Sequence, residues 1–513
     1  MKFKILALKN QLVPLFFFVL CYSFSQTSDD GKIDFTLLQL NDVYEIAPLD
    51  HGLVGGLARV ARVRKKLIAE NPNTYTVLAG DFLYPSALGT IKYNGTAMNG
   101  RQMVDVLNAM GLDLVTFGNH EFDIPESELI NRINESKFDW ISANVHHLVN
   151  GNAFPFTKLD RFEENDLAEQ KVLLFKDADG TTVHVGLFGI CINSNPKAFV
   201  QYEDYVNAAS RAIASLKQRC DILIGLTHLS IEDDKKLAAK FPEIHLILGG
   251  HEHVHSYDTV GMCRIAKADA NAKTVYIHRL QYNKTTKSLS INSSLLTIDQ
   301  SIADDPETQI KVDQWTGIGQ QSLRQQGFDP DQVIATIDQP LDGRETSVRY
   351  KATSLTELIA RSFSVAAIGA DATLYNSGSI RIDDVLQGVI TQYDVVRTLP
   401  YGGKLFILDV KGANIQKAME FAVNAKGSGS YPQVDRISRD AKGRWFIGKE
   451  VILPDKTYRL VINDYLVDVS KEFKPFFGRG SDGVISVQEP TVGNTAWMDL
   501  RQAVIQYVRQ GGR

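Results

Sequence analysis

The sequence contains little cysteine and carries no excess of positive charge. Four cysteines, scattered among 513 residues, are too few for a disulfide scaffold or a cysteine-based zinc site. Lysine and arginine together number 55 against 60 aspartate and glutamate residues, which gives a formal net charge of −5. Because no basic field gathers polyanions, we expect no nucleic acid polymer as a partner, and any phosphate chemistry must depend on local charges or metals.

Long apolar runs are also scarce, and the most prominent one lies at the N-terminus. Three lysines precede the run 12–21 (LVPLFFFVLC), which is shorter than the roughly 20 residues that span a bilayer. Ser23 and Ser25 then offer small residues where a signal peptidase reads. We therefore predict a signal peptide over residues 1–25, no membrane span in the mature form and an exported protein, periplasmic or extracellular. Cleavage would remove Cys21, and we predict no disulfide that matters to function.

The remaining composition is that of an ordinary globular protein. Hydrophobic residues make up 44% and charged residues 22% of the chain, which excludes a disordered or collagen-like protein, and the length predicts two to four domains. Residues 31–300 alternate short β-rich runs with helical patterns, which predicts a layered α/β domain. The runs typical of buried strands are 33–40, 74–79, 112–117, 221–227 and 244–248.

Each of these runs leads directly into a polar cluster, so side chains from several strand ends should meet at one face. Alone, an aspartate after a strand is usually a helix cap and a buried histidine usually just makes a hydrogen bond, but five clusters in order favour a site. Carboxylate, amide and imidazole ligands suit Zn, Mn, Fe or Co, and two such metals need about seven ligands with one carboxylate shared. The clusters supply Asp42, Asp81, Asn119, His228, His251 and His253.

The order and wording of the clusters resemble the five signature blocks of the calcineurin-like metallophosphoesterases. The blocks are Asn41-Asp42, Gly80-Asp81, Gly118-Asn119-His120-Glu121, Thr227-His228 and Gly250-His251-Glu252-His253. The run 119–123 (NHEFD) further resembles the secreted 5′-nucleotidase and UDP-sugar hydrolase branch. The resemblance implies a four-layer metallophosphoesterase sandwich and a phosphate ester attacked by hydroxide on two metals.

The resemblance also implies a role for each residue. Asp81 would bridge the two metals, Asp42 and His253 would bind one of them, and the other would take Asn119, His228 and His251. His120, oriented by Asp123, would be the unligated imidazole that stabilises the transition state and protonates the leaving group.

One block departs from the branch. Where the branch usually reads Asp-x-His, with the histidine as a ligand, this chain has Tyr44 two residues after Asp42. Tyr44 could replace that ligand in place. The second block, Gly80 to Tyr84, instead resembles that of the purple acid phosphatases, in which the tyrosinate binds a ferric ion. A phenol with an ordinary pKa of about 10 needs a strongly Lewis-acidic metal to ionise.

We therefore predict Tyr84 as a metal ligand. The predicted cofactor is Fe(III) with a divalent ion such as Zn, Mn or Fe, with di-Zn or di-Mn as alternatives. Tyr84 could instead pack in its loop and leave the metal with one protein ligand fewer.

The second half carries motifs of its own. A helical linker is predicted over 301–339, and residues 340–513 resemble the 5′-nucleotidase C-terminal domain, a smaller α+β nucleotide-binding domain. In that family two aromatic rings clamp the base and arginine holds the phosphate, and both roles fit the chemistry of these side chains. The substrate-binding residues predicted on this basis are Arg349, Asn376, Arg381, Tyr401, Phe476 and Asp482.

The sequence as a whole predicts an exported dinuclear-metal phosphohydrolase of the 5′-nucleotidase type. Its partner would be a small-molecule nucleotide or other phosphate ester. Residues 349–358 and 434–437 depart from the family pattern around the base, which leaves base preference open. The alternatives are a broad phosphomonoesterase, a 2′,3′-cyclic nucleotide phosphodiesterase and a non-catalytic nucleotide-binding protein.

Overall fold

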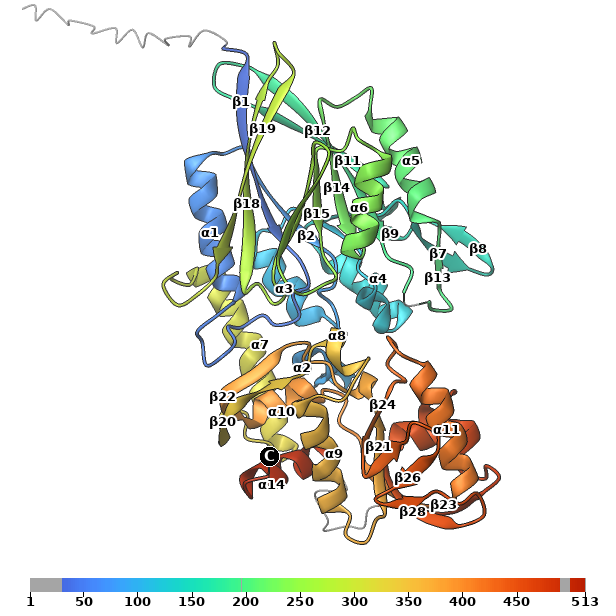
Figure 1. The fold of residues 1–513 in the computed structure, drawn as a ribbon. Helices are drawn as coiled ribbons and strands as arrows, with labels where there is room; N and C mark the ends of the chain where they lie inside the picture. The colour runs from blue at the N-terminus through green and yellow to red at the C-terminus, as the bar shows by residue number, and fades with distance from the viewer. Residues whose placement is uncertain (1–29, 195, 490–498, 513) are drawn as a thin grey trace, which may run out of the picture.

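The computed structural model describes residues 30–194, 196–489 and 499–512, which form two lobes stacked end to end (Figure 1). The predicted signal peptide lies outside these residues. Within the described ranges, no helix combines the length and the apolar character needed to cross a bilayer. The described cysteines, Cys191, Cys220 and Cys263, are free thiols.

Two six-stranded sheets form the centre of the first lobe, in the strand orders β19-β18-β1-β2-β5-β6 and β11-β12-β14-β15-β17-β16. Apolar side chains that alternate along the strands, such as Phe35 and Leu37 on β1 and Val185 and Leu187 on β12, meet between the sheets in one buried cluster. The first sheet consists of β1 (Lys32–Leu40), β2 (Thr74–Ala79), β5 (Leu114–Thr116), β6 (Asp139–Ile141), β18 (Thr274–Asn283) and β19 (Ser288–Thr297). The second consists of β11 (Gln170–Lys176), β12 (Thr182–Cys191), β14 (Ile222–His228), β15 (Leu246–Gly249), β16 (Ser256–Val260) and β17 (Cys263–Lys267).

Helices cover the outer faces of both sheets, so the predicted four-layer sandwich is confirmed. On the first sheet lie α1 (Leu57–Glu70), α3 (Arg101–Met110) and α4 (Glu126–Glu135); on the second lie α5 (Tyr205–Leu216) and α6 (Ile231–Lys240). The α3 helix ends at Gly111, whose φ of 80° is the left-handed conformation that glycine adopts without strain. Smaller elements of this lobe are α2 (Ala87–Thr90), β3 (Lys92–Tyr93), β4 (Thr96–Ala97), η1 (His120–Asp123), β7 (Val145–Val149), β8 (Asn152–Phe154), β9 (Thr157–Asp160), β10 (Glu163–Asp166) and β13 (Val200–Tyr202).

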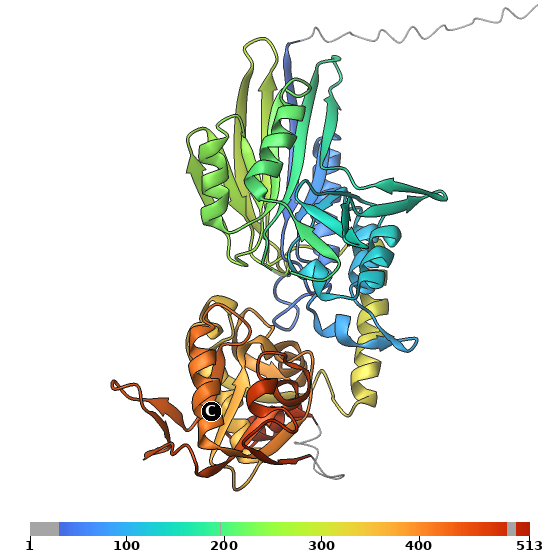
Figure 2. The same ribbon diagram turned by 90° about the vertical axis from the view of Figure 1, so that its right-hand side faces the viewer.

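The connecting helix α7 (Pro306–Gln325) is fastened to the first lobe (Figures 1 and 2). It packs against α1 and α3, and its Trp315 donates a hydrogen bond from Nε1 to Asp105 Oδ2 at 2.9 Å. A Cβ at Gly319 would lie 2.2 Å from Leu88 Cδ2, so a larger residue there would require the Leu88 side chain to move. The chain crosses to the second lobe between α7 and β20 (Val333–Asp342).

The second lobe is built on a five-stranded sheet in the order β24-β21-β28-β23-β29. Its strands are β21 (Ala372–Asn376), β23 (Leu405–Lys411), β24 (Pro432–Asp435), β28 (Thr457–Asn463) and β29 (Val484–Gln488). Its helices are α8 (Glu345–Val348), α9 (Ser354–Ala366), η2 (Ser377–Ser379), α10 (Gln392–Thr398), α11 (Gly412–Asn424), η3 (Tyr465–Val469), α12 (Lys474–Phe477) and α14 (Leu500–Arg509). Two small sheets complete it, from β20 with β22 (Val385–Thr391), and from β25 (Ile437–Arg439), β26 (Trp445–Ile447) and β27 (Glu450–Val451).

The lobes touch through buried polar contacts. Glu45 of the first lobe accepts a hydrogen bond from the hydroxyl of Tyr393 at 3.0 Å and lies 3.7 Å from Arg397 Nε. Burial raises the pKa of the Glu45 carboxyl, while Arg397 and Tyr393 oppose that rise by favouring the charged form. A further ion pair joins Lys273 to Asp384. These contacts fix the position of the second lobe relative to the first in this structure.

Candidate metal centre and substrate cavity

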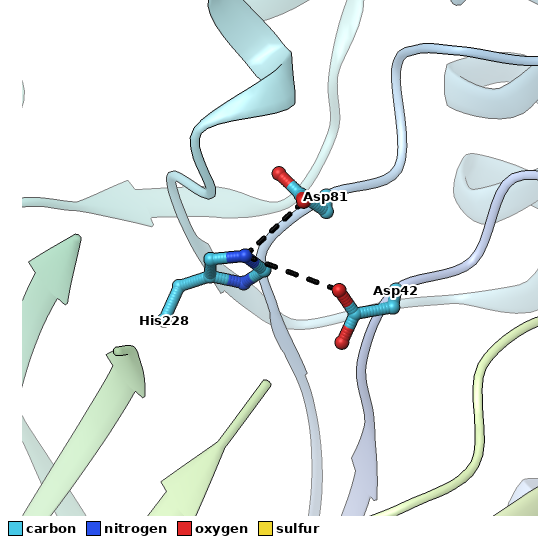
Figure 3. A group of neighbouring side chains, drawn as sticks. All are labelled: Asp42, Asp81 and His228. Carbon is cyan, nitrogen blue, oxygen red and sulfur yellow. Dashed lines mark ion pairs between the residues drawn. The ribbon is translucent and has the colours of Figure 1, made fainter. Parts of the chain in front are cut away.

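The polar clusters that follow the strands meet at one edge of the sandwich. Asp42 follows β1, Asp81 follows β2, and His228 is the last residue of β14. One ligand atom of each lies within 4.8 Å of the others, and Figure 3 shows the three side chains pointing toward one another. The expectation that strand ends gather these residues is met for this triad.

The imidazole of His228 is oriented by the backbone. Its Nδ1 donates to the carbonyl oxygen of Ala79 at 2.8 Å, so Nε2 faces Asp81 Oδ2 at 3.1 Å and Asp42 Oδ1 at 3.9 Å. Burial lowers the pKa of His228, but the two carboxylates outweigh burial and raise the pKa to about 9. This electrostatic field favours a positive charge at Nε2, which either a proton or a metal cation can supply.

These residues fit a metal ion. Asp42 Oδ1 and His228 Nε2 are buried, and no hydrogen bond of normal geometry reaches either atom from the part of the chain that the structure describes. Each atom faces an oppositely charged group at poor hydrogen-bond geometry, and a shared cation would satisfy both atoms. Two carboxylates and an imidazole are ligands that Zn, Mn or Fe accept.

The backbone at the centre is strained. Four predicted ligands have positive φ: Asp42 at 53°, Asp81 at 56°, His251 at 95° and His253 at 60°. This region is unusual for residues other than glycine and costs of order 1–3 kcal/mol each. Such strain persists only where the surrounding structure over-determines it, and here it turns these side chains toward one point.

The remaining predicted ligands lie beside the triad. His251 donates its backbone N–H to Asp42 Oδ2 at 2.9 Å, and its ring centroid is 5.3 Å from that of His228. His253 Nε2 lies 3.2 Å from Asp42 Oδ1. Asn119 is buried and lines the same cavity as His251 and His253.

The structure brings Tyr44, rather than Tyr84, to these residues. The Tyr44 hydroxyl donates to Asp81 Oδ2 at 3.1 Å and lies 3.1 Å from His253 Nε2. The ring of Tyr84 instead lies 6.1 Å from that of Tyr401 in the second lobe. Burial raises the pKa of both phenols, and nearby carboxylates raise that of Tyr44 further, so only their positions distinguish the two tyrosines. Tyr44, the other candidate for the ligand that replaces the missing histidine, is therefore favoured over Tyr84.

His120 and Asp123 form the expected pair. His120 Nδ1 lies 2.7 Å from Asp123 Oδ2, and Asp123 Oδ1 accepts from Lys197 Nζ at 3.0 Å. Burial lowers the pKa of His120, but Asp81 and Asp123 outweigh it and leave this pKa above its ordinary value. Burial would raise the pKa of Asp123, but His120, Arg381 and Lys197 hold it below its usual range. A charged carboxylate beside a protonated imidazole is suited to general acid catalysis.

Sequence reasoning missed Glu121, which fixes the loops of the centre. This fully buried carboxylate accepts backbone N–H groups of Asp81 at 2.8 Å, Phe82 at 2.7 Å, Leu83 at 3.1 Å and Gly118 at 2.6 Å. It thus ties the loop after β2 to the loop that carries Asn119. The position of Glu121 in the predicted block was the only indication of a role. The sequence alone does not distinguish a carboxylate that accepts backbone hydrogen bonds from one that binds a metal.

A cavity of about 1200 Å³ separates the centre from the second lobe. Its first wall, from the first lobe, includes Asp81, Asn119, His120, Asp123, His251 and His253. Its second wall includes Arg349, Asn376, Arg381, Tyr401 and Tyr465. Arg381 donates from Nε to the Tyr401 hydroxyl at 3.0 Å and lies 3.7 Å from Asp123 Oδ2. The predicted arginine and ring thus face the predicted catalytic pair.

Phe476 and Asp482 lie apart from this cavity. Asn414 on α11 donates from Nδ2 to the backbone oxygens of Phe476 at 2.8 Å and Asp482 at 2.6 Å. The ring of Phe476 packs 6.0 Å from that of Phe421. The loop is thereby tied to α11, and its aromatic ring joins the core of the second lobe.

Two further rings line the cavity, Tyr465 and Tyr350, and sequence reasoning missed both. Tyr401 is 45% exposed and Tyr465 is 44% exposed, and both line the cavity. Tyr465 follows Asn463 and Asp464 directly after β28. A polar pair closing a buried strand was the pattern that located the metal ligands, and the same pattern could have located this residue.

Comparison with known proteins agrees with this geometry. Residues 35–255 match the family described as calcineurin-like phosphoesterase, and residues 333–478 match the 5′-nucleotidase C-terminal domain. The chain belongs to the calcineurin-like phosphoesterases that carry a 5′-nucleotidase C-terminal domain. It is accordingly a metal-dependent phosphoric ester hydrolase.

Similar proteins extend over most of the chain. The trifunctional nucleotide phosphoesterase protein YfkN of Bacillus subtilis (strain 168) is 26% identical over 90% of this chain, which spans only 33% of YfkN. The 5′-nucleotidase of Homo sapiens is 24% identical over 79% of this chain and 75% of its own length. The structure of a 5′-nucleotidase precursor from Thermus thermophilus shares the fold, with a TM-score of 0.68 at 20% identity, over 94% of this chain and 97% of that one.

Proposed function

We propose that the chain removes phosphate from nucleotides, with two metal ions at the first wall and the nucleoside at the second wall. The observation that carries the proposal is the single cavity in which four predicted metal ligands and the His120–Asp123 pair face Arg381 and exposed tyrosine rings, Tyr401 and Tyr465 among them. Its volume of about 1200 Å³ accommodates a nucleotide, since pockets for small molecules are typically 300–1,000 Å³.

The chain's own residues divide the work. Arg381 and Arg349 bind phosphate oxygens, for which the guanidinium fork is suited. The rings of Tyr401 and Tyr465 hold the base by stacking, which tolerates different bases. His120, held by Asp123, donates a proton to the departing alkoxide. Bound at Asp42, Asp81, Asn119, His228, His251 and His253, the metals would neutralise phosphate charge and activate water.

The predicted division of the chain is part of the proposal. We assign catalysis to residues 31–300, the connection to 301–339 and substrate binding to 340–513. We also propose export, periplasmic or extracellular, on the basis of the N-terminal pattern in residues 1–25.

A second candidate is a broad phosphomonoesterase. The size of the cavity and the absence of Phe476 from its described lining favour a site that accepts several esters.

A substrate panel tests both functions. Protein loaded with Zn²⁺ or Mn²⁺ would be assayed with AMP, a UDP-sugar, a 2′,3′-cyclic nucleotide and an aryl phosphate. Preference for AMP supports the nucleotidase, and aryl phosphate cleavage without nucleotide preference supports the broad phosphatase. No hydrolysis of any compound by metal-loaded protein would contradict both and leave a nucleotide-binding protein.

A further inference from the structure

Two adjacent acidic residues of the second lobe reach the first lobe at different places. Asp383 and Asp384 lie between η2 and β22. The carboxylate of Asp383 pairs with Nδ1 of His253, and the carboxylate of Asp384 pairs with Nζ of Lys273. His253 is a predicted metal ligand, whereas Lys273 has no part in the centre. The pair therefore offers a natural comparison within one loop.

The two nitrogens of His253 face opposite partners. Nε2 lies 3.2 Å from Asp42 Oδ1 and 3.1 Å from the Tyr44 hydroxyl, on the side of the metal centre. Nδ1 faces Asp383. A histidine that binds a metal through one nitrogen usually donates its other N–H to a carboxylate or carbonyl, which fixes the ring orientation and raises its basicity. Here that carboxylate comes from the other lobe.

Asp383 is itself held by the second lobe. Its Oδ1 accepts the backbone N–H of Glu345 at the start of α8, and its backbone φ of 43° lies in the left-handed region. Its side chain is 17% exposed. The carboxylate is thus directed toward His253 by contacts that do not involve the first lobe.

We propose that Asp383 is a positioning residue through which the second lobe completes the metal centre. Its carboxylate holds the ring of His253 so that Nε2 faces the metal shared with Asp42. This inference rests on the metal centre of the proposed function. Because the contact spans the lobes, metal is held more tightly when the lobes are apposed, and by linkage the metal in turn favours apposition.

Metal affinity of the full-length chain tests the proposal. Asp383→Asn and Asp384→Asn each remove one negative charge and weaken one contact between the lobes, so they form a matched pair. Zn²⁺ binding would be measured by competition with a chromophoric chelator, and metal content by elemental analysis. In Asp383→Asn we expect one of two metals to bind about 10- to 100-fold more weakly, the usual effect of losing such a partner, and the other metal to bind normally.

The control variant, Asp384→Asn, should differ from Asp383→Asn mainly in metal affinity. Asp384→Asn weakens a contact between the lobes without touching His253, so it should lower metal affinity far less than Asp383→Asn, while thermal unfolding of the metal-free chains should shift by similar amounts in both variants. Asp383→Ala, which removes the acceptor altogether, should weaken the same metal at least as much as Asp383→Asn.

Three results would overturn the proposal. Wild-type affinity in Asp383→Asn and Asp383→Ala, or equal weakening in the Asp383→Asn and Asp384→Asn variants, would overturn it while leaving the proposed function standing. A wild-type chain that takes up no metal would overturn the metal centre itself and the inference with it.

Discussion

The two walls of the cavity are built in different ways. The first wall places buried side chains at strand ends, several of them on a strained backbone, and Glu121 fixes two of its loops. The second wall presents half-exposed rings and two arginines, with Arg381 after η2, Tyr401 after α10 and Tyr465 in η3. Strain and burial restrict the side chains of the first wall to one arrangement. A residue of the second wall, in contrast, can be substituted at a modest cost in folding stability. We therefore expect the first wall to determine the chemistry and the second to determine the substrate.

The largest effect should follow loss of the central carboxylate. Asp81→Ala should reduce kcat/KM by more than the 10²- to 10³-fold typical of one lost transition-state donor, because both metals would lose their shared ligand. Elemental analysis should show reduced metal content. Full metal content with full activity in Asp81→Ala would contradict the claim that the first wall determines the chemistry.

His120→Ala should separate chemistry from metal binding within the first wall. Loss of the general acid should lower kcat by about 10²- to 10⁴-fold, and metal content should stay at the wild-type level, since the side chain is not a predicted ligand. Loss of metal in this variant would show that His120 is a ligand.

Changes in the second wall should act mainly on substrate binding. Tyr465→Ala should raise KM for AMP by roughly 5- to 150-fold, corresponding to about 1–3 kcal/mol of stacking, with a smaller change for a phosphate ester that has no base. Phe476→Leu is the matched control outside the cavity and should leave KM unchanged. The reverse result would restore Phe476 as the clamping ring.

The smallest effect is expected from two tyrosines. Tyr44→Phe should alter metal affinity or spectrum, because its hydroxyl contacts Asp81 and His253, whereas Tyr84→Phe should not. If the bound pair contains Fe(III), the visible absorption band of a tyrosinate should vanish in Tyr44→Phe alone. A colourless loaded protein would indicate a divalent pair such as di-Zn or di-Mn, and loss of the band in Tyr84→Phe would restore Tyr84 as the ligand.

The same contrast explains what the sequence could predict. Asp42, Asp81 and His228 could be predicted because each closes a buried strand. Parallel β1 and β2 bring the first two ends together, and the packing of the second sheet on the first brings β14 with His228 beside them. Tyr44 and Tyr84 could not be separated, since the direction of a loop side chain depends on contacts such as that with Tyr401. Phe476 was misplaced for a similar reason, because the hydrogen bonds from Asn414 decide where its loop lies. Asp383 had no signal, since its partner stands in the other lobe.

The attachment of α7 to the first lobe sets how far the walls can separate. Only residues 326–332 lie between α7 and β20, and a chain extends at most about 3.3–3.6 Å per residue. Such a short tether keeps the second wall at an effective concentration of about millimolar or above near the first, even when the contacts between them break. Arg381 and Asp383 then regain their contacts with the first wall by an intramolecular step. A separately expressed second lobe would form the same contacts to the same extent only at a comparable concentration.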